Sequence, residues 1–196
     1  GIGTLADTIG DVSDLADACV DQALAHHHGW LTQRFGTPRD EMGNPARMVV
    51  LGLGKLGGRE LNFSSDIDLI YTYDGGGDTD GDKQISNQEF FIKLGRKMVG
   101  SLDRIDAGGF VFRTDLRLRP NGDSGPLAVN FDARAEYYQS QGREWERYAM
   151  IKARAVAGPK KSAGQLMKLL RPFVYRRYLD FGAFESLRNL KEQIAR

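Results

Sequence analysis

The stretch that decides the fold of this chain is Gly52-Leu53-Gly54-Lys55-Leu56-Gly57-Gly58-Arg59-Glu60-Leu61-Asn62-Phe63-Ser64-Ser65-Asp66-Ile67-Asp68-Leu69. It joins two apolar segments, Met48–Leu53 and Ile67–Tyr73, each of which predicts a buried strand. Asp66 and Asp68 stand where the second strand begins. Side chains two residues apart on a strand share a face, so both carboxylates are expected to point the same way.

The spacing of Asp66 and Asp68 predicts a cation site. Their Cα atoms are expected about 6.5 Å apart, at about 3.3 Å per residue. Two carboxylates so placed repel each other unless a cation lies between them, and hard oxygen ligands suit Mg²⁺ or Mn²⁺. Taken alone, however, Asp-x-Asp is common and favours a polar strand entrance in water. A third acid changes that interpretation.

The third acid is Asp115, in the segment Phe110–Leu118, whose alternating residues predict a third strand. Its polar face also carries Arg117, and Arg119 continues the same alternation. Beside the first two acids, Asp115 would complete a trio able to hold two metal ions roughly 3.5–4 Å apart for phosphoryl or nucleotidyl transfer. The two arginines are then expected to neutralise phosphate oxygens. The alternative is a solvated outer face with local ion pairs.

The glycine-rich turn has two competing interpretations. Residues 52–57 match the dinucleotide fingerprint G-x-G-x-x-G, and Asp74 lies about twenty residues further on, where that fold places its ribose acid. The spacing argues against it, because Asn62–Ser65 breaks the chain before a crossover helix can form. The Walker pattern also fails, since Gly58 stands where its lysine belongs. The remaining prediction is a helix start whose backbone N–H groups face a nucleotide phosphate.

Outside these strands the chain is predicted to be mostly helical, with a linker at Gly36–Pro45. The predicted helices are Leu5–Phe35, Asn87–Arg104, Phe131–Ser140, Arg143–Val156 and Ser162–Ile194. Pro172 is expected to kink or interrupt the last one. The predicted fold class is α/β (α+β), with an N-terminal helical segment at 5–36, a core at 46–158 and a C-terminal helical segment at 160–196.

Composition bounds the function only loosely. The 196 residues carry a formal net charge of +1, which selects neither nucleic acid nor a membrane as partner, so we expect neither. Cys19 is the only cysteine, which excludes an intrachain disulfide and makes a reducing cytoplasm the simplest setting. The sequence has no apolar run of membrane-spanning length and does not open on a secretion signal.

Three weaker signals favour ordinary explanations. The run His26–His28 points in different directions on a helix and makes a poor metal cage. The acids between Asp78 and Glu89 have the spacing of a calcium loop, but Lys83 replaces the required glycine. Lys152 is expected either to snorkel at a core edge or to contact phosphate.

The order of strand, glycine turn, short helix, Asp-x-Asp strand and third acidic strand resembles the polymerase-β-like nucleotidyltransferase superfamily. More closely, residues 52–69 resemble the catalytic stretch of the glutamate–ammonia-ligase adenylyltransferase (glutamine synthetase adenylyltransferase/deadenylylase) family. Three further segments are similar to that family: Phe110–Pro120, Gly142–Ala149 and Arg176–Asp180. The resemblance covers nearly the whole chain from Met48 onward, and four motifs in the same order make it specific.

The resemblance implies a multifunctional enzyme of nitrogen metabolism. The family's full-length enzyme is much longer and has two catalytic halves. One half attaches AMP to a tyrosine of glutamine synthetase, and the other removes it with inorganic phosphate and releases ADP. Ser64-Ser65-Asp66, where the adding half has Gly-Ser-Asp, resembles the removing, N-terminal half, as do residues 143–148 and 172–178. Gly158-Pro159 departs from the family, which has an acid after the glycine. A PII signalling protein and glutamine are implied as regulators.

These inferences assign the site residues. Asp66, Asp68 and Asp115 are expected to hold two Mg²⁺ or Mn²⁺ ions, with ATP, ADP and phosphate as substrates or products. Contacts to nucleotide or phosphate are expected at Gly54, Lys55, Gly57, Gly58, Ser64, Ser65, Arg117, Arg119 and Lys152. Two rival functions remain: AMP transfer from ATP to glutamine synthetase, and a non-catalytic nucleotide-sensing module. Three acids that repel each other without metal argue against the second rival.

Overall fold

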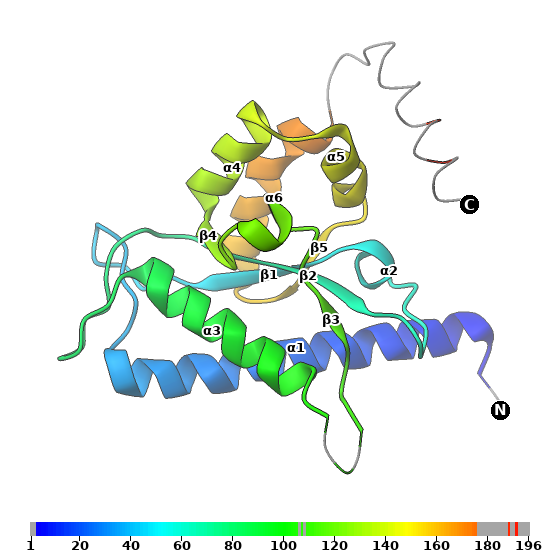
Figure 1. The fold of residues 1–196 in the computed structure, drawn as a ribbon, viewed down its shortest axis with the longest axis horizontal. Helices are drawn as coiled ribbons and strands as arrows, with labels where there is room; N and C mark the ends of the chain where they lie inside the picture. The colour runs from blue at the N-terminus through cyan, green and yellow to red at the C-terminus, as the bar shows by residue number, and fades with distance from the viewer. Residues whose placement is uncertain (1–2, 106, 108, 176–187, 189–190, 192–196) are drawn as a thin grey trace.

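The computed structural model of the chain describes residues 3–105, 107, 109–175, 188 and 191. Six helices, one short 3₁₀ turn and five strands follow one another in this part of the chain (Figure 1). In order they are α1 (Leu5–Phe35), β1 (Met48–Gly52), α2 (Gly54–Gly57), β2 (Ile67–Tyr73), α3 (Asn87–Leu102), β3 (Thr114–Asp115), the 3₁₀ turn Gly122–Ser124, β4 (Ala128–Asn130), α4 (Phe131–Ser140), α5 (Glu144–Met150), β5 (Arg154–Ala157) and α6 (Lys160–Val174).

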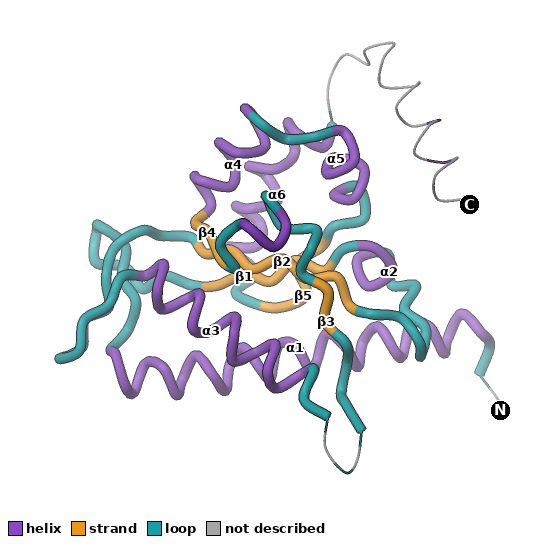
Figure 2. The backbone as a smooth tube through the Cα atoms, viewed as in Figure 1, coloured by secondary structure: helices purple, strands orange, loops and turns teal. Residues whose placement is uncertain are grey.

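The strands form one mixed sheet in the order β3-β2-β1-β5 (Figure 2). β1 runs antiparallel to both β2 and β5. β3 and β4 both run parallel to β2 and share its other edge, β3 beside the start of β2 and β4 beside its end. This mixed sheet with flanking helices confirms the predicted α+β class, and it places the first residues of β2 next to β3.

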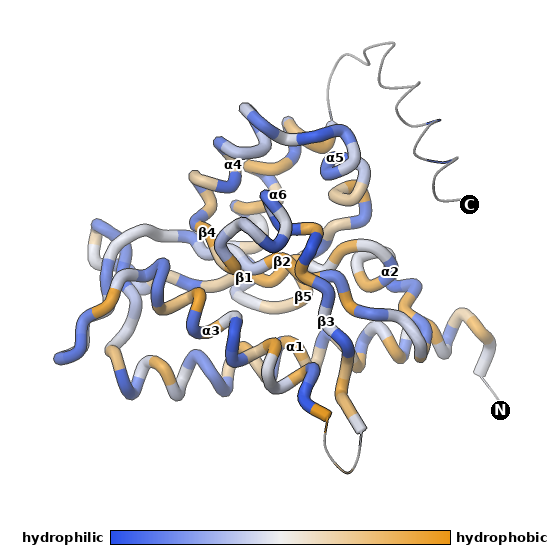
Figure 3. Tube along the Cα trace, in the orientation of Figure 1, coloured by the Kyte–Doolittle hydropathy of each residue, from blue (hydrophilic) through white to orange (hydrophobic). Residues whose placement is uncertain are grey.

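Helices cover both faces of the sheet (Figure 1). β1 is buried on both sides: Met48 and Val50 belong to the apolar cluster under α1 and α3, whereas Val49 and Leu51 belong to the cluster under α4 and α6. Along α1 and α3 apolar and polar residues alternate, as expected of helices with one face in the core (Figure 3). Among the described residues, no helix has both the length and the apolar composition that a membrane crossing needs.

The predicted strand Phe110–Leu118 is wrong in its length, because only two of its residues pair with β2. Before the strand, the backbone N–H groups of Val111 and Phe112 both donate to the carbonyl of Leu102 at the end of α3. After it, the carbonyl of Leu116 accepts from the backbone of Arg119 in a turn. Competing hydrogen bonds at both ends therefore shorten the strand to the residues that carry the acid.

The predicted helix Arg143–Val156 is also wrong beyond Met150, because Arg154–Ala157 forms β5 on the free edge of β1. Alanine favours helices, and β5 contains two alanines, so the local sequence predicts a helix. Pairing with β1 makes this segment a strand instead. α6 begins at Lys160, two residues earlier than predicted. Pro172 lies in its last turn, and the helix ends at Val174. Most of the remainder of the predicted C-terminal helix, including Arg176–Asp180, lies outside the described residues.

Candidate active site

Strands β2 and β3 bring the predicted acids together. Asp68 on β2 is the register partner of Asp115 on β3, and Asp66 directly precedes β2. Burial, followed by the charges of Asp115 and Asp66, raises the pKa of the Asp68 carboxyl. The three acids therefore repel one another across the ends of two neighbouring strands, as their spacing in the sequence predicted.

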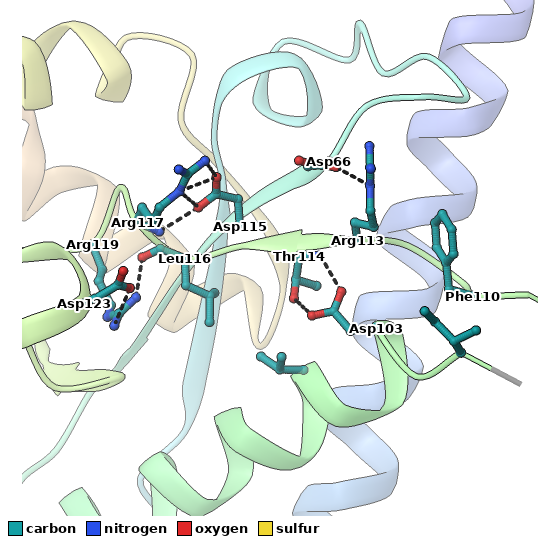
Figure 4. Close-up of a pocket in the computed structure, with 12 residues that line it drawn as sticks. Asp66, Asp103, Phe110, Arg113, Thr114, Asp115, Leu116, Arg117, Arg119 and Asp123 are labelled. Atoms are coloured by element: carbon teal, nitrogen blue, oxygen red, sulfur yellow. Dashed lines mark hydrogen bonds and ion pairs between the residues drawn. The ribbon is translucent and has the colours of Figure 1, made fainter.

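Two of the acids are paired with arginines (Figure 4). Asp66 Oδ1 lies 2.6 Å from Nε of Arg113, whose Nη2 also donates to the carbonyl of Ser64 at 3.0 Å. Asp115 accepts hydrogen bonds from the backbone N–H of Arg117 at 2.8 Å and from its Nε at 2.9 Å. These hydrogen bonds hold the pKa of Asp115 below its usual range. With two acids so paired, no group of three His, Cys, Asp or Glu side chains converges on a metal position within the described part of the chain.

The residues present nevertheless fit a divalent metal ion. Carboxylate oxygens are the donors that Mg²⁺ and Mn²⁺ prefer. Gly54, at φ +54°, passes over the Asp68 carboxylate so closely that a Cβ there would lie 2.6 Å from Asp68 Oδ2. The glycine therefore keeps open a cradle above Asp68, the one acid of the trio that forms no ion pair with an arginine among the described residues. A cation in that cradle would relieve the repulsion that raises the pKa of Asp68.

The other two predicted glycines of the turn pack against Lys152. A Cβ on Gly57 would lie 2.2 Å from the carbonyl oxygen of Lys152, and one on Gly58 would lie 3.1 Å from Cδ of the same lysine. Close packing against the segment that leads into β5 therefore explains these two glycines. The Lys152 ammonium pairs with Glu60 at 2.6 Å, and both side chains are half exposed. Lys152 thus packs against the glycine turn and pairs with Glu60.

The polar residues between the turn and β2 form a small network. Lys55 Nζ donates to Ser65 Oγ at 3.0 Å, and Ser65 Oγ donates to Asn62 Oδ1 at 2.6 Å. The Ser64 hydroxyl also reaches Asn62, at 3.2 Å, while its carbonyl holds Arg113. These contacts fix the loop that carries Asp66 into β2. The predicted residues Lys55, Ser64 and Ser65 are therefore near the acids.

Arg117 and Arg119 have different environments. The Arg117 side chain is 75% exposed, whereas that of Arg119 is only 10% exposed. Arg119 Nη1 donates to the carbonyl of Leu116 at 2.7 Å, and Nη2 lies 3.3 Å from Asp123. Both arginines lower the pKa of Asp115, Arg117 chiefly by hydrogen bonding and Arg119 by its charge. Arg119 thus stabilises the turn after β3 from a nearly buried position, and it also places a positive charge near the acids.

An open cleft of about 630 Å³ lies along β3 (Figure 4). Its lining includes Asp66, Asp115 and the arginines just described, together with apolar residues such as Phe110 and Leu116. Sequence reasoning missed Asp103, which lines the cleft and accepts from the backbone and the hydroxyl of Thr114 at 2.6 and 2.7 Å. The predicted alternation put Thr114 on the face opposite Asp115, but nothing in the sequence pointed to its partner at the end of α3.

Comparison with known proteins identifies the family of this chain. The family profile described as glutamate-ammonia ligase adenylyltransferase matches residues 1–169. A protein of Thioalkalivibrio sulfidiphilus is 60% identical over 196 residues, all of this chain, and one of Pseudomonas aeruginosa is 58% identical over 192 residues, 97% of it. Both are named bifunctional glutamine synthetase adenylyltransferase/adenylyl-removing enzyme, and the chain spans 20% of the length of each. The chain therefore belongs to the glutamate-ammonia ligase adenylyltransferase family.

Proposed function

We propose that this chain removes AMP from an adenylylated tyrosine of glutamine synthetase by phosphorolysis and releases ADP. The observation that carries the proposal is the register pairing of Asp68 with Asp115, beside Asp66, at the ends of two strands. The names of the relatives support the substrate, since they include both adenylyl transfer to glutamine synthetase and adenylyl removal. The family membership supports a nucleotidyltransferase in particular.

The three carboxylates would hold two Mg²⁺ or Mn²⁺ ions in this proposal. When bound, such ions supply charge for the phosphate oxygens and for the departing tyrosinate oxygen. Asp68 has no arginine partner among the described residues and is the acid under the Gly54 cradle. Asp66 and Asp115 would exchange Arg113 and Arg117 for metal, because both arginine side chains are exposed to solvent.

The arginines released in this way would bind the reacting phosphates. Arg117 lies in the same cleft as Asp115, and its planar guanidinium matches two oxygens of a phosphate group. Inorganic phosphate is already an anion, so the nucleophile needs an electropositive position rather than a strong general base. Attack on the AMP phosphorus then breaks its bond to the tyrosine oxygen and leaves ADP.

The proposed direction of transfer rests on the sequence similarity of three motifs to the removing half of the family. The carboxylates serve either direction, and the arginines of the cleft suit a phosphate nucleophile as well as the tail of ATP. Ser64-Ser65-Asp66 and residues 143–148 resemble the removing half of the family. Residues 172–178 resemble it too, although only 172–175 are described.

The proposal is tested by two assays run side by side on this chain with radiolabelled adenylate. We expect phosphate-dependent release of labelled ADP from adenylylated glutamine synthetase with Mg²⁺ present. We expect little transfer of label from ATP onto the unmodified enzyme. Transfer without release would reverse the assignment. Nucleotide binding with neither reaction would favour the non-catalytic module.

A further inference from the structure

One face of α1 contacts the segment that carries the glycine turn, although the paired residues are 45 and 48 positions apart in the sequence. The buried hydroxyl of Ser13 accepts a hydrogen bond from the backbone N–H of Leu61 at 3.2 Å. One residue on, Asp14 pairs with Arg59 at 2.5 Å, and both side chains are more than half exposed. The first contact is buried and holds the end of the segment, whereas the second lies at the surface.

The third contact is the most specific. Asp17 lies one helical turn after Ser13, and its two carboxylate oxygens accept from Nη1 and Nη2 of Arg154 on β5 at 2.5 and 2.9 Å. Both side chains are three-quarters buried or more. Nη2 of the same arginine also donates to the carbonyl of Leu56 in α2, at 3.0 Å. The planar guanidinium therefore joins α1, β5 and α2 in one arrangement, which a lysine in its place cannot reproduce.

The position of α2 matters for the acids because α2 touches one of them. Gly54, its first residue, lies against the Asp68 carboxylate with no room for a Cβ. Leu53, just before it, donates its backbone N–H to the carbonyl of Asp68 at 3.0 Å. A shift of α2 by a few tenths of an ångström would therefore change the space above Asp68. The hydrogen bond from Arg154 to the carbonyl of Leu56 is one of the contacts that hold α2 in place.

We propose that Asp17 and Arg154 are positioning residues of the active site, which hold α2 at the distance that leaves the Asp68 carboxylate open to a divalent cation. The inference rests on the proposed function, since it assumes that Asp68 is a metal ligand. It assigns a role in the site to α1, an element that contributes no side chain to the cleft.

The test measures Mn²⁺ binding by calorimetry for the wild-type chain and four variants. Asp17→Ala removes the partner of Arg154, and Asp17→Glu retains a carboxylate that can still reach it. Asp14→Ala is the matched control, because it removes the same charge from the same helix at an exposed pair. Val12→Ala is a second control, because it opens the core under α1 without touching Arg154. The melting temperature of each variant is measured in parallel.

We expect Asp17→Ala to weaken Mn²⁺ binding about tenfold, the lower end of the effect of removing outer-shell support from a metal ligand. Asp17→Glu should restore most of the affinity. Asp14→Ala and Val12→Ala should bind Mn²⁺ like wild type, even where Val12→Ala melts at a lower temperature than Asp17→Ala. Wild-type affinity in Asp17→Ala would overturn the positioning role and leave the proposed function standing. A wild-type chain that binds no Mn²⁺ would overturn both. Equal weakening in Val12→Ala would reduce Asp17 to a general stabilising role.

Discussion

Asp68 and Asp115 lie directly opposite each other on two parallel strands, held by register rather than by any bond between them. Burial and the other two acids raise the pKa of Asp68, whereas hydrogen bonds from Arg117 lower the pKa of Asp115. Neighbouring carboxylates with pKa values displaced in opposite directions are typical of functional sites. The fold thus places unfavourable charge at one position where a cation would stabilise it.

Asp68→Asn tests whether that unfavourable charge serves metal binding. We expect Mn²⁺ affinity and turnover to fall by more than about a hundredfold, above the range for outer-shell changes. In the absence of metal the variant should melt at a higher temperature than wild type, because a carboxylate that its neighbours repel has been removed. Calorimetric titration and thermal melts in chelator check both expectations. Turnover above about a tenth of the wild-type rate would contradict the two-metal assignment.

The two arginines after β3 should separate binding from stability. Arg117→Ala removes an exposed side chain, so we expect little change in stability, weaker binding of inorganic phosphate and tighter binding of Mn²⁺, since Asp115 loses a competing partner. Arg119→Ala removes a nearly buried guanidinium and its hydrogen bond to the carbonyl of Leu116, and should cost about 1–3 kcal/mol of unfolding free energy.

Lys152→Ala is the matched control for these arginine variants. It removes a cation that pairs with Glu60 at the surface and packs against the glycine turn. We therefore expect phosphate binding to remain at the wild-type level and stability to change by less than about 1 kcal/mol. Chemical denaturation and phosphate titration measure both properties. An Arg119→Ala variant as stable as Lys152→Ala would contradict the stabilising role of Arg119.

The sequence was sufficient to predict the trio of acids because the argument needed only local information. Asp66 and Asp68 are two residues apart at the start of a strand, so their side chains lie on the same face. The glycine stretch leads directly into that strand. The pairing of β2 with β3 then placed Asp115 correctly, even though β3 is far shorter than the alternating pattern predicts. The short strand still contains Asp115, because the competing hydrogen bonds are made by residues before and after the strand.

Long-range partners were beyond sequence reasoning. Arg154 pairs with Asp17 on α1, 137 residues away in the chain. Its strand, β5, consists of residues that also suit a helix, so only the open edge of β1 decides its conformation. Likewise, no local pattern connects Asp103 with Thr114. Contacts of this kind depend on how elements pack, which a single sequence does not specify residue by residue.

His28 gives a pH prediction away from the acids. Burial, followed by the charge of Arg47, lowers its pKa from 6.5, so the folded state favours the neutral ring. The stability that this neutral ring contributes is present above the unfolded value and is lost as pH falls from 6.5 through the lowered pKa. We therefore expect wild type to lose more stability than His28→Gln between neutral pH and pH about 5. Denaturation curves across this range measure the difference. His27→Gln is the control for the neighbouring ring, whose pKa burial also lowers. Parallel pH profiles for wild type and His28→Gln would contradict the prediction.

Gly54→Ala tests the close contact between the Gly54 backbone and the Asp68 carboxylate. Gly54 has φ +54°, a conformation that costs other residues about 1–3 kcal/mol, and its Cβ would lie 2.6 Å from Asp68 Oδ2. We expect alanine to lower the free energy of unfolding and to weaken Mn²⁺ binding, because either the turn or the Asp68 carboxylate must move.

Gly29→Ala is the matched control: this glycine lies within α1 with no atom within 4 Å of the added carbon. Alanine there should stabilise the helix by about 0.5–1 kcal/mol and leave Mn²⁺ binding unchanged. Chemical denaturation and calorimetric titration of the two variants separate the cost of strain from the loss of the metal cradle. A Gly54→Ala variant that unfolds more easily but binds Mn²⁺ as wild type does would mean that the glycine serves only the backbone conformation, and the close contact with Asp68 would lose its functional meaning.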